Sequence, residues 1–409
     1  MQKTTIVKNA ASLTLMQVAN ALVPLFVIPF VVRALGVEAF GKVSYAQTIV
    51  AYFSLLVNYG FEYSATQEIA LNREQSCRLR VIFWSVLKSK LFLLLVAFLA
   101  YVGLIFLSPR FEGDTMLYLF AFLINVGMAI TPTWFFQGME SMWWVALINV
   151  VMKVLAALFI LLLVVGSSDY NLYVLLMSLS YCGAGLALFF LAYFKYELKY
   201  ESLFDFSPVR KGFPIFLNTA LSNIYALGGI TIIGIYLSNA EIGIYAGAHK
   251  IVSAMSMMLS MPLSMALFPA LSREFSQSVQ LGWKSLKKCI GLVFVVGSVF
   301  TVVLYGMSPI IVKIFLGDAF SDVIPLLQML SPIPMLVVMA TMFTVQGLYG
   351  MQAQNAAPLV GGVVALFSLV AYWLATPMYG VYAAAVVYII SELLEIMIVY
   401  LILFRRIHP

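Results

Sequence analysis

The sequence predicts an all-α integral membrane protein, with twelve transmembrane helices arranged as two lobes of six. Three observations lead to this fold class. The chain of 409 residues is 63% hydrophobic and only 10% charged, whereas a water-soluble domain carries about 25% charged residues. Its apolar residues occur in runs of about 20, the length of helix that crosses a bilayer. The two halves of the chain also share short matching segments in the same order.

Twelve segments are apolar and long enough to span a membrane. We expect helices near residues 13–34, 43–62, 82–107, 116–136, 143–165, 172–194, 213–236, 244–268, 290–308, 324–348, 357–376 and 381–404. Residues 1–200 then form an N-terminal lobe and residues 201–409 a C-terminal lobe. The apolar run of the first span is too long for a cleaved signal peptide, so we expect it to remain as a helix.

The positions of the cationic residues predict the orientation. With the N-terminus in the cytoplasm, 17 of the 23 lysines and arginines fall in inner segments, Lys88 and Lys90 among them, and four fall in outer loops, Lys313 among them. Such a bias is typical of the cytoplasmic side of a multi-pass membrane protein. We therefore expect both termini in the cytoplasm, and we assign the basic runs to membrane topology, with no nucleic-acid partner.

The two halves resemble each other in sequence. The segment LGVEAFGKVSYAQTIV (35–50) aligns with LSNAEIGIYAGAHKIV (237–252) at an offset of 202 residues. The third and ninth predicted spans both end in Ser-Pro, at 108–109 and 308–309, and the fourth and tenth both end in Gln-Gly. Because each half has an even number of spans, the repeat is parallel, with its axis along the membrane normal. Two such lobes around a central cavity are typical of transporters.

Several cationic and polar residues are expected at membrane depth, where an ionisable group must face a wet cavity or a partner. Lys250 and His249 begin a polar stripe with helical spacing on the eighth span. Lys153 lies within the fifth span, with Asn149 one turn before it, and Arg33 ends the first span. The expected cavity-lining residues are Arg33, Asn149, Lys153, His249, Lys250, Ser253, Ser256 and Ser260, and Ser264 continues the stripe. These cations predict an anionic cargo, and lysines suit phosphate.

Some of these residues also have a purely structural interpretation. Lys250 can extend its ammonium group to the outer headgroups. The serines of the same stripe disfavour this interpretation, because their hydroxyl groups would find no hydrogen-bond partner in lipid. Arg33 can be an interfacial anchor. Glu392 and Glu395 share one face of the twelfth span. We interpret this pair either as a site for a coupling ion, H⁺ or Na⁺, or as residues paired internally with a lysine. Glu62 is interpreted as a residue at a span boundary.

The sequence contains no enzyme signature. It has no metal-type spacing of His and Cys, no phosphate-binding Gly-rich loop and no nucleotide-binding cassette, and its three cysteines are far apart. We therefore expect a transporter without a metal or cofactor, driven by an ion or cargo gradient or by downstream reactions. A membrane-embedded glycan polymerase or ligase is disfavoured, because the predicted outer loops are short.

Four stretches carry a family resemblance that extends over essentially the whole chain. The Wzx family of O-antigen and polysaccharide-unit flippases is resembled by RALGVEAFGKVSYAQTIVAYFSLLVNYGFEYSATQEIALNRE (33–74), TPTWFFQGME (131–140), FPIFLNTALSNIYALGGITIIGIYLSNAEIGIYAGAHKIV (213–252) and ALFPALSREF (266–275). The resemblance implies the fold of the superfamily that includes MATE multidrug and toxin exporters and lipid II flippases. A cation-coupled multidrug exporter and a lipid II-type flippase are the alternatives on the same fold.

The resemblance also implies a cargo and a mechanism. The cargo would be an undecaprenyl-pyrophosphate-linked oligosaccharide, moved to the outer leaflet by alternating access through a cationic cavity. Implied partners are a polysaccharide polymerase and a chain-length regulator. Arg33, Lys153 and Lys250 match basic positions of the family by their place in the spans, and the position of Lys153 is commonly arginine in relatives. Glu62 receives no role from the family.

Overall fold

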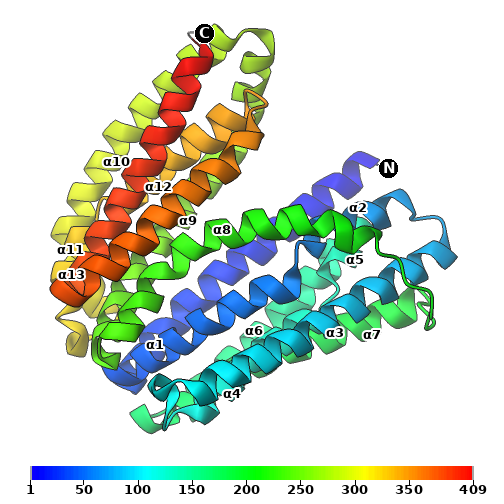
Figure 1. Cartoon of the computed structure of the whole chain (residues 1–409), viewed down its shortest axis with the longest axis horizontal. Helices are drawn as coiled ribbons and strands as arrows, with labels where there is room; N and C mark the ends of the chain where they lie inside the picture. The colour runs from blue at the N-terminus through cyan, green and yellow to red at the C-terminus, as the bar shows by residue number, and fades with distance from the viewer. Residues whose placement is uncertain (1, 408–409) are drawn as a thin grey trace. The chain divides into compact units, whose positions relative to one another are not determined.

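The computed structural model describes residues 2–407, with the side chains of residues 2–25, 218, 221–226, 261, 265 and 354 outside its described part. The described backbone is helical and contains no strand. Eight of its helices are long and apolar enough to cross a membrane (Figure 1). These findings agree with the predicted all-α membrane class.

The chain divides into two compact units, which we call unit 1 (Met1–Ala220) and unit 2 (Leu221–Pro409). In unit 1, α4 packs against α7, and α1 packs against α4, α6 and α7. The helix α6 also packs against α7. The helix α1 is interrupted at Gly36, whose φ of 76° only glycine adopts readily. The elements up to the end of α7 are α1 (Gln2–Asn58), α2 (Phe61–Leu71), α3 (Ser76–Leu107), η1 (Pro109–Phe111), α4 (Thr115–Ile130), α5 (Thr133–Gly138), α6 (Met142–Leu163), η2 (Ser167–Asp169) and α7 (Tyr170–Lys195).

Unit 2 is built around α9, which packs against α10, α11 and α12. Its last helix is interrupted at Gly380, with a φ of 62°, so it comprises two helical segments. The remaining elements of the chain are α8 (Ser207–Tyr236), α9 (Asn239–Gln277), α10 (Val279–Phe315), η3 (Asp318–Phe320), α11 (Val323–Leu330), α12 (Ile333–Thr341), η4 (Met342–Tyr349), η5 (Gln354–Ala356) and α13 (Ala357–Ile407).

The helix breaks follow the offset seen in the sequence repeat. Gly36 interrupts α1, and Ser238, which is 202 residues further on, separates α8 from α9. The Ser238 hydroxyl accepts a hydrogen bond from the main-chain N–H of Glu241, whose carboxylate accepts one from the N–H of Ser238 in return. In the first half of the repeat the helix is thus interrupted at a glycine, and in the second half a new helix begins at a capping box.

One matched feature of the repeat has a different structure in the two halves. The helix α3 ends directly before Ser-Pro at 108–109, as predicted, but α10 continues through Ser308 and Pro309 to Phe315. Proline removes the N–H that would bond the carbonyl four residues earlier. The Ser308 hydroxyl donates to that carbonyl, on Tyr305, at 2.8 Å, and this replaces the missing bond. Lys313 therefore lies in the last turn of α10 and not in an outer loop.

The segment between α7 and α8, residues 196–206, is bound along α3. The Trp84 indole donates to two of its carbonyl oxygens, at 3.0 and 3.2 Å. The Lys88 ammonium donates to a third at 2.8 Å. Arg78 forms an ion pair with Asp205 at 2.6 Å. These contacts attach the connecting segment to unit 1.

The first turns of α8 are also attached to unit 1. The buried Glu68 carboxylate accepts hydrogen bonds from the Ser207 hydroxyl at 3.0 Å and the Lys211 ammonium at 2.5 Å. Gly60 lies so close to Gly212 that a Cβ on Gly60 would come within 2.8 Å of the Gly212 carbonyl oxygen. These contacts explain why unit 1 extends to residue 220, twenty residues beyond the boundary that we placed at 200.

The Glu68–Lys211 ion pair makes the stability of unit 1 depend on pH. The hydrogen bond from the Lys211 ammonium lowers the pKa of Glu68 below its ordinary 4.5, against the opposing effect of burial. A lowered pKa in the folded state stabilises the fold above the ordinary value, and this stabilisation is lost as the pH falls through the pKa of the folded protein.

We predict that Glu68→Gln lowers the free energy of unfolding at pH 7 by about 1–3 kcal/mol, the value of a hydrogen bond to a charged group. The difference between variant and wild type should be smaller at pH 3.5, because the Glu68 carboxylate takes up a proton as the pH falls through its lowered pKa in the folded protein. Thermal unfolding in detergent at pH 7 and pH 3.5 measures both. Glu112→Gln, at an exposed position, is the control, and an equal difference at the two pH values would contradict the prediction.

The crossing of α4 and α7 depends on two glycines. A Cβ on Gly127 would lie 2.5 Å from the carbonyl carbon of Tyr181, and a Cβ on Gly185 would lie 2.6 Å from the Gly127 carbonyl oxygen. Small residues of this kind let the backbones of membrane helices approach closely.

We predict that Gly127→Ala destabilises unit 1 by about 1–3 kcal/mol, because the added methyl group meets backbone atoms that have no room to move. The melting temperature in detergent should fall accordingly. Gly103→Ala on α3 is the matched control, since a Cβ there meets no atom within 4 Å. Equal melting temperatures for the two variants would show that the crossing is not tightly packed.

Candidate functional site

Unit 1 carries three of the predicted cavity residues. Lys153 and Asn149 lie on α6, where both are partly buried, and Arg33 lies on the first segment of α1, where it is exposed. The Asn149 amide donates to the Val145 carbonyl oxygen at 2.8 Å, within its own helix. The residues next to Lys153 on α6, Val154 among them, are exposed apolar side chains. Lys153 therefore lies beside the face of α6 that is suited to lipid.

Unit 2 carries the polar stripe of α9, and its serines point into the protein. Ser256 is 5% exposed, whereas Met258 on the opposite face of the helix is 55% exposed. The hydroxyl groups of Ser260 and Ser264 are buried and have no hydrogen-bond partner among the described residues. The interior of unit 2 thus contains unsatisfied polar atoms along α9, as expected for a path that water or a polar ligand occupies.

His249 lies between two tyrosine rings at the start of this stripe. Its ring is stacked on Tyr245 with centroids 5.8 Å apart, and it is 5.5 Å from the ring of Tyr388 on the second segment of α13. Its Nδ1 atom is 3.4 Å from the Ser253 hydroxyl. Lys250, the next residue, is partly buried. The structure therefore places the imidazole between two aromatic rings, and both His249 and Lys250 are partly buried.

The two carboxyl groups of the twelfth predicted span have different surroundings. Glu392 is only 3% exposed and lies one turn after Tyr388 on α13. Glu395 is partly buried and accepts a hydrogen bond from the Thr344 hydroxyl of η4 at 3.2 Å. The structure brings Glu392 together with His249 through Tyr388, whereas it directs Glu395 to another element of unit 2.

Sequence reasoning missed a buried charge in unit 1. Lys90, which we assigned to a cytoplasmic segment, is 1% exposed and donates to the Met128 carbonyl oxygen at 2.8 Å. It also interacts electrostatically with Glu62 in the first turn of α2. The helix α3 begins at Ser76 and not near 82, so Lys90 lies about 21 Å along it. A lysine directly before a long apolar run looks like an interfacial anchor, and only the earlier helix start reveals its depth.

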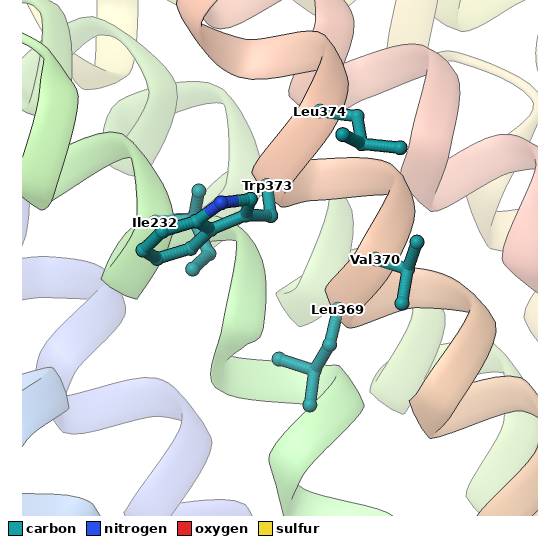
Figure 2. Close-up of a pocket in the computed structure, with 5 residues that line it drawn as sticks. All are labelled: Ile232, Leu369, Val370, Trp373 and Leu374. Atoms are coloured by element: carbon teal, nitrogen blue, oxygen red, sulfur yellow. The ribbon is translucent and has the colours of Figure 1, made fainter.

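A hollow of about 360 Å³ lies between α8 and the first segment of α13 in unit 2 (Figure 2). The indole of Trp373 forms one wall of it and packs edge to face against Tyr236. Its lining is apolar, from Ile232, Leu369, Val370, Trp373 and Leu374. Such a lining suits a hydrocarbon chain and offers nothing to an anion, so the hollow is separate from the cationic residues.

Comparison with known proteins places this fold and sequence among membrane transporters. Residues 6–275 match the family described as polysaccharide biosynthesis protein. The chain is 25% identical over 391 residues to a protein of Escherichia coli (strain K12) named "Putative O-antigen transporter", and the match covers 95% of this chain and 94% of that protein.

Two solved structures have the same fold. The lipid II flippase MurJ, in an inward closed conformation, superposes with a TM-score of 0.69 at 14% identity, over 94% of this chain and 86% of that one. An inward-facing multidrug transporter of the MATE family superposes with a TM-score of 0.65 at 14% identity, over 95% and 98% of the two chains. At this identity, the likeness concerns the fold alone.

We predict that Lys250 is reached by water. In a background with Cys77, Cys182 and Cys289 replaced by serine, Lys250→Cys should react with a hydrophilic, charged thiol reagent, because the reaction needs a hydrated thiolate. Met258→Cys, at a 55% exposed apolar position on the opposite face of the same helix, is the matched control. It should stay unmodified, because lipid does not ionise a thiol. Modification of Met258→Cys alone would show that the polar stripe is closed to water.

Proposed function

Because the chain belongs to the polysaccharide biosynthesis protein family, we propose that it is a Wzx-type flippase of the bacterial inner membrane. It moves an undecaprenyl-pyrophosphate-linked oligosaccharide repeat unit from the cytoplasmic to the outer leaflet. Twelve spans form two lobes of six, with both termini in the cytoplasm. The match to the family over residues 6–275 is the observation that carries the proposal.

The chemistry of the cationic residues supports an anionic lipid headgroup as cargo. Lys153 on α6 and Lys250 on α9 lie within apolar helices, where an ammonium group is costly unless it meets water or an anion. Arg33 on α1 supplies a third cation. Pyrophosphate presents several negative oxygens, and lysine ammonium groups bind them as point charges while arginine binds them as a planar fork. These three residues hold the pyrophosphate in the proposed mechanism.

Alternating access supplies the movement. The headgroup enters a cationic central cavity that is open to the cytoplasm, while the polyprenyl chain stays in the bilayer. The lobes then open outward, and a coupling ion at Glu392 resets the cycle. A polysaccharide polymerase and a chain-length regulator receive the unit outside. The serine stripe of α9 lines the polar path in unit 2, with Asn149 contributing in unit 1.

The two other transporters of this fold are distinguished by the charge of their cargo. An exporter of cationic drugs needs acidic or aromatic groups in its cavity, whereas Lys153 and Lys250 are basic. A lipid II-type flippase carries the same pyrophosphate, so its cavity chemistry is equivalent. Drug resistance on overexpression indicates the exporter, and restoration of cell-wall synthesis in a flippase-deficient strain indicates the lipid II-type flippase.

We predict that Lys153→Ala and Lys250→Ala each reduce surface polysaccharide by about 10-fold or more, because each removes a charged hydrogen bond worth about 1.5–3 kcal/mol. Immunoblots of surface polysaccharide in a flippase-deleted strain carrying each variant measure the effect. Lys313→Ala is the control, because its side chain is 73% exposed and forms an exposed pair with Asp318. Wild-type polysaccharide in both test variants, at equal protein levels, would refute the cationic-cavity mechanism.

A further inference from the structure

A buried polar cluster in unit 2 joins three helices. We call it the His249 cluster, and it consists of Tyr245, His249, Tyr372, Tyr388 and Glu392. Tyr245 and His249 lie on α9, Tyr372 lies on α13 before its interruption at Gly380, and Tyr388 and Glu392 lie after it. The helix α8 closes the cluster from a third side. The cluster therefore ties both segments of the broken helix α13 to the polar stripe of α9.

Close contacts define the α8 side of the cluster. A Cβ on Gly229 would come within 2.9 Å of the Tyr245 hydroxyl and 3.3 Å of the Tyr372 hydroxyl. The two tyrosines share a side-chain hydrogen bond, and both are almost completely buried. Neither hydroxyl group reaches the protein surface. The two tyrosines therefore pack the α8 side of the cluster and hold the His249 ring in place without contact to solvent.

The other side of the cluster joins the imidazole to a carboxyl group. The rings of His249 and Tyr388 are 5.5 Å apart. Glu392 follows Tyr388 by four residues, so the two side chains lie on the same face of α13, and the phenol and carboxyl groups interact electrostatically. A base and an acid thus lie on either side of one tyrosine, with Glu392 buried and His249 and Tyr388 partly buried.

The surrounding charges restrict the proton states of this pair. Among the described residues, α11 and α12 carry no ionisable side chain, and the segment Leu227–Tyr236 of α8 carries only tyrosine. Lys250, the next residue on α9, interacts electrostatically with His249, and α10, which packs against α9, carries lysines at 284, 287, 288 and 313. Glu395 is directed to Thr344 of η4. A buried carboxylate and a neutral imidazole carry one negative charge together, and uptake of one proton makes the pair neutral overall.

We propose that Glu392 and His249, connected through Tyr388, hold one exchangeable proton and form the proton-coupling site of this transporter. The proposal rests on the proposed function and assigns His249 to coupling in place of cargo binding. The proton comes from the water on one side of the membrane and leaves to the other side, so no further reactant is needed. Uptake of the proton removes a buried negative charge, and its release restores that charge next to the break at Gly380.

The test is a proton-binding titration of the purified full-length protein in detergent, which needs no cargo. Between pH 5 and pH 8, wild type should bind about one proton more than Glu392→Gln, and His249→Gln should lose the same proton. The double variant should lose no more than either single variant, because the two groups share one proton. Tyr388→Phe, which keeps the ring, should shift the pH at which this proton binds.

Three controls make the result decisive. Glu395→Gln should titrate like wild type, and melting temperatures show that each variant is folded. Losses that add in the double variant, or an unchanged titration of His249→Gln, would overturn the shared site. A midpoint that moves when NaCl replaces choline chloride would overturn the proton in favour of a sodium ion.

Transport assays keep this proposal separate from the proposed function. His249→Gln should lose the stimulation of transport by an imposed pH gradient, whereas Lys250→Gln should lose transport with or without that gradient. If the shared proton is lost in the Glu392 and His249 variants but the lysine variants transport normally, the coupling site is supported and the cationic cavity is refuted. If the lysine variants lose transport but no shared proton is found, only the coupling site is refuted.

Discussion

The exclusion of water from the membrane interior is the constraint on which the rest of this structure depends. A backbone carbonyl or a charged side chain in hydrocarbon must find a partner inside the protein. Ser308 restores the bond that Pro309 removes from α10, and Lys90 donates to the Met128 carbonyl oxygen inside unit 1. The same constraint makes Ser260 and Ser264 of α9 notable, because their hydroxyl groups are buried without a hydrogen-bond partner among the described residues.

The helix breaks place functional groups where continuous helices would not. The interruption of α13 at Gly380 separates Tyr372 from Tyr388, and the two then meet Gly229 of α8 and His249 of α9. A straight helix of this length would extend its second half far from His249. In unit 1, the break at Gly36 lets a single long helix provide two packing segments. Glycine is required at both breaks because the left-handed backbone there is unfavourable for residues with a Cβ.

Acidic and basic groups have separate places in the proposed cycle. Lysines near the exposed faces of α6 and α9 meet the cargo, whereas the carboxyl group of Glu392 is enclosed among aromatic rings and exchanges only a proton. This separation is physically sensible, because a carboxylate beside pyrophosphate would repel it. The apolar hollow beside Trp373 belongs to neither group and offers only hydrocarbon contacts.

The sequence by itself determined the membrane class, the positions of most helices and the polar stripe of α9, because these follow from local composition and from helical spacing. It also identified Lys250, His249 and Glu392 as unusual, since ionisable residues within apolar runs are rare. Only the tertiary structure decided that His249 and Glu392 share one cluster, since they are 143 residues apart in the chain. The depth of Lys90 and the attachment of the first turns of α8 to unit 1 likewise depend on contacts between distant segments, which local periodicity does not encode.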